Sequence, residues 1–126
     1  MIYLYLAAGS VAGALSRYQL GVWVTGLTSN PLGFPWATFI INVSGSFVMG
    51  FFMEYLSDIA SSREMRAMLT IGFCGSYTTF STFSHESVTL LREGQTSLAF
   101  LYGGGSFVLA PLAYLAGFFL ARSIRG

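Results

Sequence analysis

Long uncharged stretches alternate along the chain with short polar segments. Residues 18–53, 67–84 and 94–121 contain no aspartate, glutamate, lysine or arginine, and another mostly apolar run begins at Ile2. A helix that crosses a bilayer needs roughly 20 predominantly apolar residues. Each stretch is long enough, or nearly so, to span a membrane, and the pattern indicates an integral membrane protein.

The polar interruptions divide the chain into four helices. A turn cluster occupies 28–33, a loop with four charged residues occupies 57–66, and a short polar segment follows at 92–95. A membrane barrel would need strands of alternating polarity, which long uncharged blocks do not supply. We therefore expect an all-α membrane protein with one domain over residues 1–126, with its four spans at about 2–27, 35–56, 67–91 and 96–121.

Composition and charge narrow the class of protein further. Of the 126 residues, 54% are hydrophobic and 9% are charged, whereas a soluble domain usually has about a quarter charged residues. The formal net charge is +1, so no basic patch is available for nucleic acid. A soluble enzyme and a nucleic-acid binder are both excluded. No catalytic constellation accompanies the single histidine, and we interpret the single cysteine, Cys74, as a packing residue.

The arginines are spread too evenly to favour one orientation strongly. Four spans place both termini and the 57–66 loop on one side, where four arginines lie. At most two arginines, Arg17 and Arg92, remain for the other side. This is a weak bias under the positive-inside rule, and it is compatible with insertion in both orientations.

Small residues are frequent and recur at helical spacing. The chain has 15 glycines, and Gly9 and Gly13 are separated by three residues, as are Ser46 and Gly50. Such steps let helix backbones approach closely in lipid. Any one of them is best explained by packing within a subunit, but the whole set leads us to expect a homo-oligomer.

Polar groups also occur at the depth of the bilayer. Asn42 lies in an apolar run near the middle of the second span, where its amide either bonds a neighbouring helix or contributes to a polar path. In the third span, residues 72–84 hold two glycines and six serines or threonines, which disfavour a continuous helix. We expect a break near 75–79. Carbonyls exposed there would suit a hard cation such as Na⁺, whereas amides, hydroxyls and a helix N-terminus would suit an anion.

Two phenylalanines follow this expected break. Phe80 and Phe83 are three residues apart and share a helix face. Such a pair usually packs in a core or faces lipid, but the positive ring edges can also line a narrow pore without binding an anion tightly. Arg17, His85 and Glu86 lie nearer the span ends, where we interpret them as interfacial groups rather than a buried proton relay.

Several of these motifs resemble the Fluc/CrcB family of fluoride channels over nearly the whole chain. They are residues 13–18 (GALSRY), Thr38 followed by Asn42, and above all residues 72–84 (GFCGSYTTFSTFS). The resemblance implies a passive, F⁻-selective channel that lets fluoride leave the cell. It also implies an antiparallel, dual-topology homodimer with two pores, a multi-pass protein of the bacterial cytoplasmic membrane.

The resemblance also implies roles for individual residues. Gly75 and Thr78 would offer backbone carbonyls to a central Na⁺, with four oxygens from two copies. Arg17, Thr38 and Glu86 match vestibule or structural polar positions. The pore residues would be Asn42, Phe80, Ser81, Thr82, Phe83, Tyr102 and Ser106. Ser76 and Ala110 depart from the family pattern, which has glycine at the first position and often serine at the second.

Two other classes of protein also fit four short helices. A small dual-topology multidrug exporter that is coupled to protons needs an acidic residue deep in its first span, and residues 2–27 contain none. A non-transporting structural subunit would have no need for the polar residues at 75–84.

Overall fold

The computed structural model describes residues 1–28, 33–57 and 62–126, and the regular structure within these ranges is entirely helical. The all-α prediction is therefore confirmed for these residues. Most of the predicted turn at 28–33, and part of the predicted loop at 57–66, lie outside the described residues. In chain order the elements are α1 (Ile2–Leu27), α2 (Trp36–Tyr55), α3 (Arg63–Ala67), η1 (Met68–Cys74), α4 (Gly75–Tyr77), α5 (Phe80–Arg92) and α6 (Thr96–Arg125).

Helices occupy the predicted stretches, with differences at two ends. The third stretch becomes helical at Arg63 rather than at 67, because the Ser62 side chain accepts a hydrogen bond from the Met65 amide and caps α3. Helix α6 continues to Arg125, beyond the expected end at 121. This last turn is stabilised because the Arg125 side chain bonds the carboxylate of Glu54 at the end of α2.

Two of the described helices are long and apolar enough to cross a membrane. They are α2 and α6, with mean hydropathies of 1.5 and 1.7 over their most apolar windows. Only 22% and 11% of these windows are buried inside the chain, whereas the core helix of a soluble protein is mostly buried. Helix α1 has the length to cross but is less apolar. A membrane location explains why such apolar helices stay uncovered.

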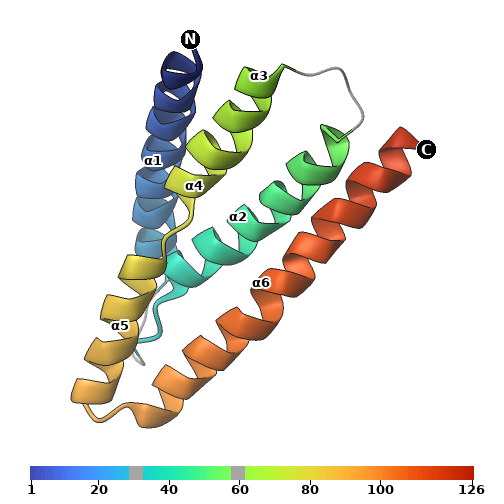
Figure 1. The fold of residues 1–126 in the computed structure, drawn as a ribbon. Helices are drawn as coiled ribbons and strands as arrows, with labels where there is room; N and C mark the ends of the chain where they lie inside the picture. Colours follow the sequence, from blue (N-terminus) through green and yellow to red (C-terminus); the bar gives the residue numbers. More distant parts are fainter. Residues whose placement is uncertain (29–32, 58–61) are drawn as a thin grey trace.

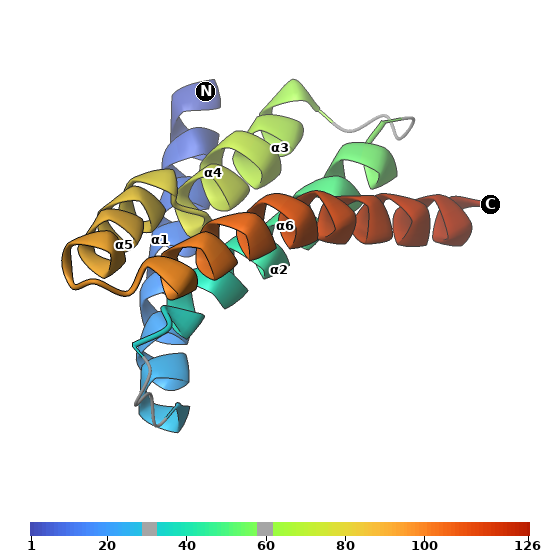
Figure 2. The same ribbon diagram turned by 90° about the horizontal axis from the view of Figure 1, so that it is seen from below.

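The helices pack mainly as two groups (Figure 1). Helices α2 and α6 lie side by side, and both views show them running together (Figure 2). Helix α1 packs against η1 and α4, and α5 packs against α6. Both termini and α3 lie toward one end of the molecule in Figure 1, and the connection between α5 and α6 lies at the other end.

Glycines allow close backbone contact at both crossings. A Cβ atom at Gly117 of α6 would collide with the Phe47 carbonyl of α2, and one at Gly50 of α2 would collide with the Tyr114 carbonyl of α6. At the α1–η1 crossing, a Cβ at Gly9 would collide with the Met68 carbonyl. These glycines therefore pack helices within one chain, and they supply no argument for an oligomer.

Candidate functional site

The helical backbone of the third segment is interrupted at two threonines. Thr78 (φ −79°, ψ 159°) and Thr79 (φ −150°, ψ 120°) are extended and separate α4 from α5. Backbone N–H and C=O groups at such a point lose their helical partners and must find others. The side chains around Thr79 show where those partners come from.

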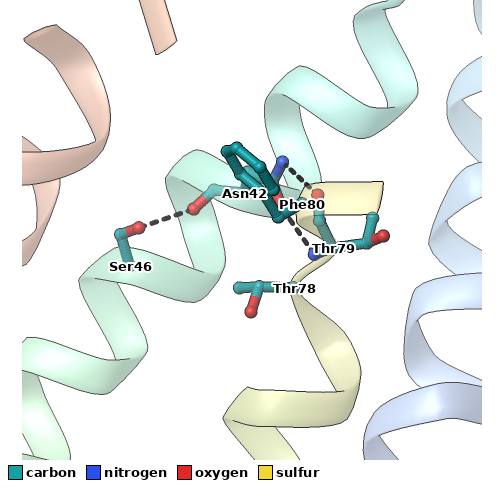
Figure 3. Close-up of a pocket in the computed structure, with 5 residues that line it drawn as sticks. All are labelled: Asn42, Ser46, Thr78, Thr79 and Phe80. Carbon is teal, nitrogen blue, oxygen red and sulfur yellow. Dashed lines mark hydrogen bonds between the residues drawn. The ribbon is translucent and has the colours of Figure 1, made fainter. Parts of the chain in front are cut away.

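Asn42 of α2 pairs with the backbone of Thr79. The Thr79 amide donates to Asn42 Oδ1 at 2.8 Å, and Asn42 Nδ2 donates to the Thr79 carbonyl at 3.0 Å. Figure 3 shows this two-point contact between α2 and the connection that follows α4. Of the two roles considered for Asn42 from the sequence, the structure shows a hydrogen bond to a neighbouring helical segment. Its amide nitrogen carries a second hydrogen, so one donor remains for another acceptor.

Thr79 is also the N-cap of α5 and gathers nearby hydroxyls. Its side-chain oxygen accepts from the Thr82 amide at 3.2 Å and donates to the Thr82 hydroxyl at 3.0 Å. The Ser81 hydroxyl lies 3.4 Å from the Thr79 hydroxyl. The predicted residues Ser81 and Thr82 are therefore brought together around Thr79, which sequence reasoning did not select. A threonine just before a helical run is an N-cap signal that could have found it.

The same contacts leave two carbonyls without helical partners. In a continuous helix the Thr79 amide would bond the Gly75 carbonyl, but it donates to Asn42 instead. The Thr82 amide would likewise bond the Thr78 carbonyl, but it donates to the Thr79 side chain. Neutral carbonyl oxygens of this kind are suitable ligands for a hard cation. Across residues 1–28, 33–57 and 62–126, no three His, Cys, Asp or Glu side chains gather as an alternative metal site.

A small hollow lies directly against this interruption. It has a volume of about 210 Å³. The residues that line it come from α2 and from the interruption and start of α5 (Figure 3), and they are Asn42, Ser46, Thr78, Thr79 and Phe80. The Ser46 hydroxyl donates to the Asn42 backbone carbonyl at 2.8 Å, so it is held on the wall of this hollow.

A larger hollow shares two of these residues and brings together four of the predicted pore residues. It has a volume of about 410 Å³, and its walls come from α2, α5 and α6. The residues that line it are Asn42, Phe80, Phe83, Gly103, Ser106, Phe107 and Ala110. The Ser106 hydroxyl is buried and has no hydrogen-bond partner. A buried unpaired hydroxyl is uncommon in folded proteins and marks a place where a polar ligand or water can bind.

The aromatic side chains form a continuous wall. The rings of Phe80 and Phe83 lie 5.7 Å apart between centroids, and those of Phe83 and Tyr102 lie 4.9 Å apart. Phe80 is 79% exposed in the isolated chain, whereas Tyr102 is fully buried. The wall therefore extends from the surface of the chain into its core.

At the far end of this wall, Glu86 joins three helices. The Thr38 hydroxyl of α2 donates to Glu86 Oε1 at 2.7 Å, and the Tyr102 hydroxyl of α6 donates to Glu86 Oε2 at 2.7 Å. Hydrogen bonds to a carboxylate are short and strong. The structure thus brings together three residues that were predicted separately. Glu86 is part of a hydrogen-bond network between these helices.

Arg17 lies apart from the other predicted residues. It lines a broad groove between α1 and α2, together with Tyr18, Gly21 and Ala37. Its groove shares no lining residue with the two hollows at Asn42. Within one chain, Arg17 therefore lines neither of the hollows at Asn42.

Comparison with known proteins agrees with the resemblance in the motifs. Residues 4–118 match the family described as CrcB-like protein, Camphor Resistance (CrcB). The fluoride-specific ion channel FluC of Thermus thermophilus is 40% identical over 124 residues, which cover 98% of this chain and 96% of that protein. The FluC of Rhizobium meliloti is also 40% identical, over 96% of each chain. FluC 1 of Moorella thermoacetica is 43% identical over 97% of this chain and 86% of its own length.

The match runs through every element that builds the site, from α2 to the larger part of α6. Identity of about 40% over nearly the full length of both chains leaves no large insertion or missing segment that would alter this site. The family is one of ion channels rather than enzymes, in keeping with the apolar, weakly charged composition. The chain belongs to the CrcB-like family of membrane proteins.

Proposed function

We propose that this protein is a passive, fluoride-selective ion channel. The observation that carries the proposal is the convergence of Asn42, Phe80, Phe83 and Ser106 on one hollow beside the interrupted helix. The curated relatives named fluoride-specific ion channels support the same conclusion. The expected physiological effect is to lower fluoride inside the cell by letting F⁻ move down its gradient.

The chemistry of the walls suits a small anion that gives up its water in steps. Removing water from an ion costs tens of kcal/mol in a dry medium, so the path must supply replacement donors. The free N–H of Asn42, the hydroxyl of Ser106 and the hydroxyls near Thr79 are such donors. The positive edges of Phe80 and Phe83 add weaker attraction. None of these groups carries a full charge, which favours conduction over tight capture.

A complete pore is proposed to need a second copy of the chain. Phe80 and Phe107 line the larger hollow and are 79% and 80% exposed, so that hollow is open on one side. We infer an antiparallel homodimer with two pores, each closed by both copies. The weak arginine bias permits both orientations. In this arrangement four spans cross the bacterial cytoplasmic membrane, and the third is broken at Thr78 and Thr79.

The free carbonyls of Gly75 and Thr78 are proposed to hold Na⁺ between the two copies. They fit because each lacks its helical partner and because a dimer would supply four such oxygens. A bound Na⁺ would join the two chains and supply positive charge near the anion path. Asn42 contributes by keeping the Thr79 amide away from the Gly75 carbonyl.

A liposome assay tests the proposed function. Vesicles loaded with potassium fluoride and containing the purified protein are placed in fluoride-free buffer, and a fluoride electrode follows efflux after valinomycin is added. We expect rapid F⁻ efflux and no comparable Cl⁻ efflux. Efflux equal to that of protein-free vesicles, or equal rates for the two anions, contradicts the proposal. A proton-coupled multidrug exporter is not favoured, because α1 contains no carboxylate.

A further inference from the structure

The residue just before the interruption is also bonded to α2. Tyr77, the last residue of α4, is buried, and its hydroxyl lies 2.9 Å from the Ser44 hydroxyl of α2. The Ser44 hydroxyl donates its one hydrogen to the Ile41 carbonyl at 3.1 Å, so Tyr77 is the donor between the two hydroxyls. This bond uses none of the atoms that join Asn42 to Thr79.

A glycine lets the end of α4 approach α2 this closely. A Cβ atom at Gly45 would collide with the methyl group of Thr78 and would lie 2.9 Å from the Tyr77 ring. Figure 3 shows the Thr78 side chain on the α2 side of the interruption. The Thr78 hydroxyl donates to the Cys74 carbonyl at 2.9 Å, which holds the methyl group in place. The Tyr77 ring is held by stacking on Phe73, with 5.8 Å between centroids.

Helix α2 therefore holds the interruption at both ends. Tyr77 is bound at its near end and Thr79 at its far end, with Thr78 between them. The partners Ser44 and Asn42 are two residues apart in a regular helix, which fixes the distance between the two attachment points. Loss of the bond at Tyr77 lets the backbone of the interruption turn, so the Thr79 amide leaves Asn42 Oδ1 more often.

We propose that the hydrogen bond between Tyr77 and Ser44 positions the interruption for anion conduction. The proposal rests on the fluoride conduction proposed above, because the bond acts through Asn42 and Phe80, which line both hollows. The described walls of these hollows include neither Tyr77 nor Ser44. Both are therefore positioning residues, and their effect on an anion passes through the residues that they hold in place.

Amide exchange of the reconstituted protein tests this positioning without any conduction. In Tyr77→Phe the ring and its packing remain, and only the hydroxyl is removed. Exchange of the Thr79 amide is expected to become about three- to twentyfold faster, the range that corresponds to side-chain hydrogen bonds in membranes. Tyr55→Phe is the matched control, because Tyr55 stacks on Phe51 at the far end of α2. Wild-type exchange of the Thr79 amide in Tyr77→Phe overturns the proposal.

Fluoride efflux shows whether the bond also matters for conduction. Vesicles are prepared at low protein density, so the final fraction of fluoride released counts the vesicles with a folded channel and the initial rate gives the flux per channel. Tyr77→Phe and Ser44→Ala are each expected to lower the rate at least about threefold and to leave the fraction unchanged. Because both changes remove one bond, the double variant is expected to be no slower than the slower single variant.

The outcomes separate this proposal from the channel function. If the wild type shows no efflux above protein-free vesicles, the channel function fails, and the role in conduction fails with it. If the wild type conducts but Tyr77→Phe keeps the wild-type rate, only the positioning role is overturned. A loss confined to the fraction released assigns the bond to folding alone and overturns the proposal. Effects of Tyr77→Phe and Ser44→Ala that multiply in the double variant overturn it as well, since the two residues then act separately.

Discussion

The contact between Asn42 and Thr79 makes a quantitative prediction about the interrupted helix. In Asn42→Leu the side chain keeps a similar volume but loses the bonds of 2.8 and 3.0 Å to the Thr79 backbone. Leaving a buried backbone group unpaired costs about 1–3 kcal/mol, but side-chain hydrogen bonds in membranes contribute about 0.6 kcal/mol on average. We therefore expect a destabilisation between about 0.6 and 3 kcal/mol, confined to the interruption.

Hydrogen–deuterium exchange of the reconstituted protein measures this effect directly. Amides at 78–82 should exchange about 3- to 150-fold faster in Asn42→Leu, which corresponds to that free energy. Fluoride efflux should fall about tenfold, because the free N–H of Asn42 is lost as well. Ser46→Ala is the matched control for exchange, since the Ser46 hydroxyl bonds only a carbonyl of its own helix. Wild-type exchange and wild-type efflux in Asn42→Leu would refute this account of the site.

Three further predictions concern the pore and the packing. Phe80→Ile and Phe83→Ile should each lower the rate of fluoride efflux sharply, while size-exclusion chromatography still finds the wild-type oligomer. Unchanged efflux in both variants would show that the two rings do not line the fluoride path. Gly117→Val should lower the melting temperature and the yield of folded protein, because its Cβ meets the α2 backbone, whereas Gly104→Ala has open space and should stay within about 0.5 kcal/mol of the wild type. Arg125→Gln should cost about 0.5–1.5 kcal/mol in thermal unfolding at low salt, because it breaks a half-buried ion pair of 3.0 Å. If the destabilisation by Arg125→Gln is as large at high salt as at low salt, the contact is not stabilised by the attraction between the two charges.

Much of the helical layout was predictable from the uncharged stretches and the polar residues between them. Helix α1 covers Ile2–Leu27, the residues of the first predicted span. Helix α6 continues beyond the predicted span to Arg125. The ion pair of Arg125 with Glu54 joins residues 71 positions apart, so no local pattern could reveal it. Thr79 was missed as a site residue because its importance depends on Asn42, which comes from another helix.

The site itself was predictable only as a set of separate residues. Their types pointed to hydroxyls, an amide and aromatic rings at the depth of the membrane, and family motifs implied their roles. Spacing along one helix could not reveal that Glu86 accepts from both Thr38 and Tyr102, because these residues lie on three different helices. Nor could it reveal that the Ser106 hydroxyl is buried without a partner.

By itself, the sequence determined that this chain is helical and belongs in a membrane. The reason is that apolar content and charge spacing act locally, over the roughly 20 residues that cross a bilayer. Tertiary structure decided which polar groups meet: it paired Asn42 with the Thr79 backbone and thereby released the Gly75 carbonyl. Those contacts depend on how closely α2 approaches the interrupted helix, and no local pattern specifies that distance.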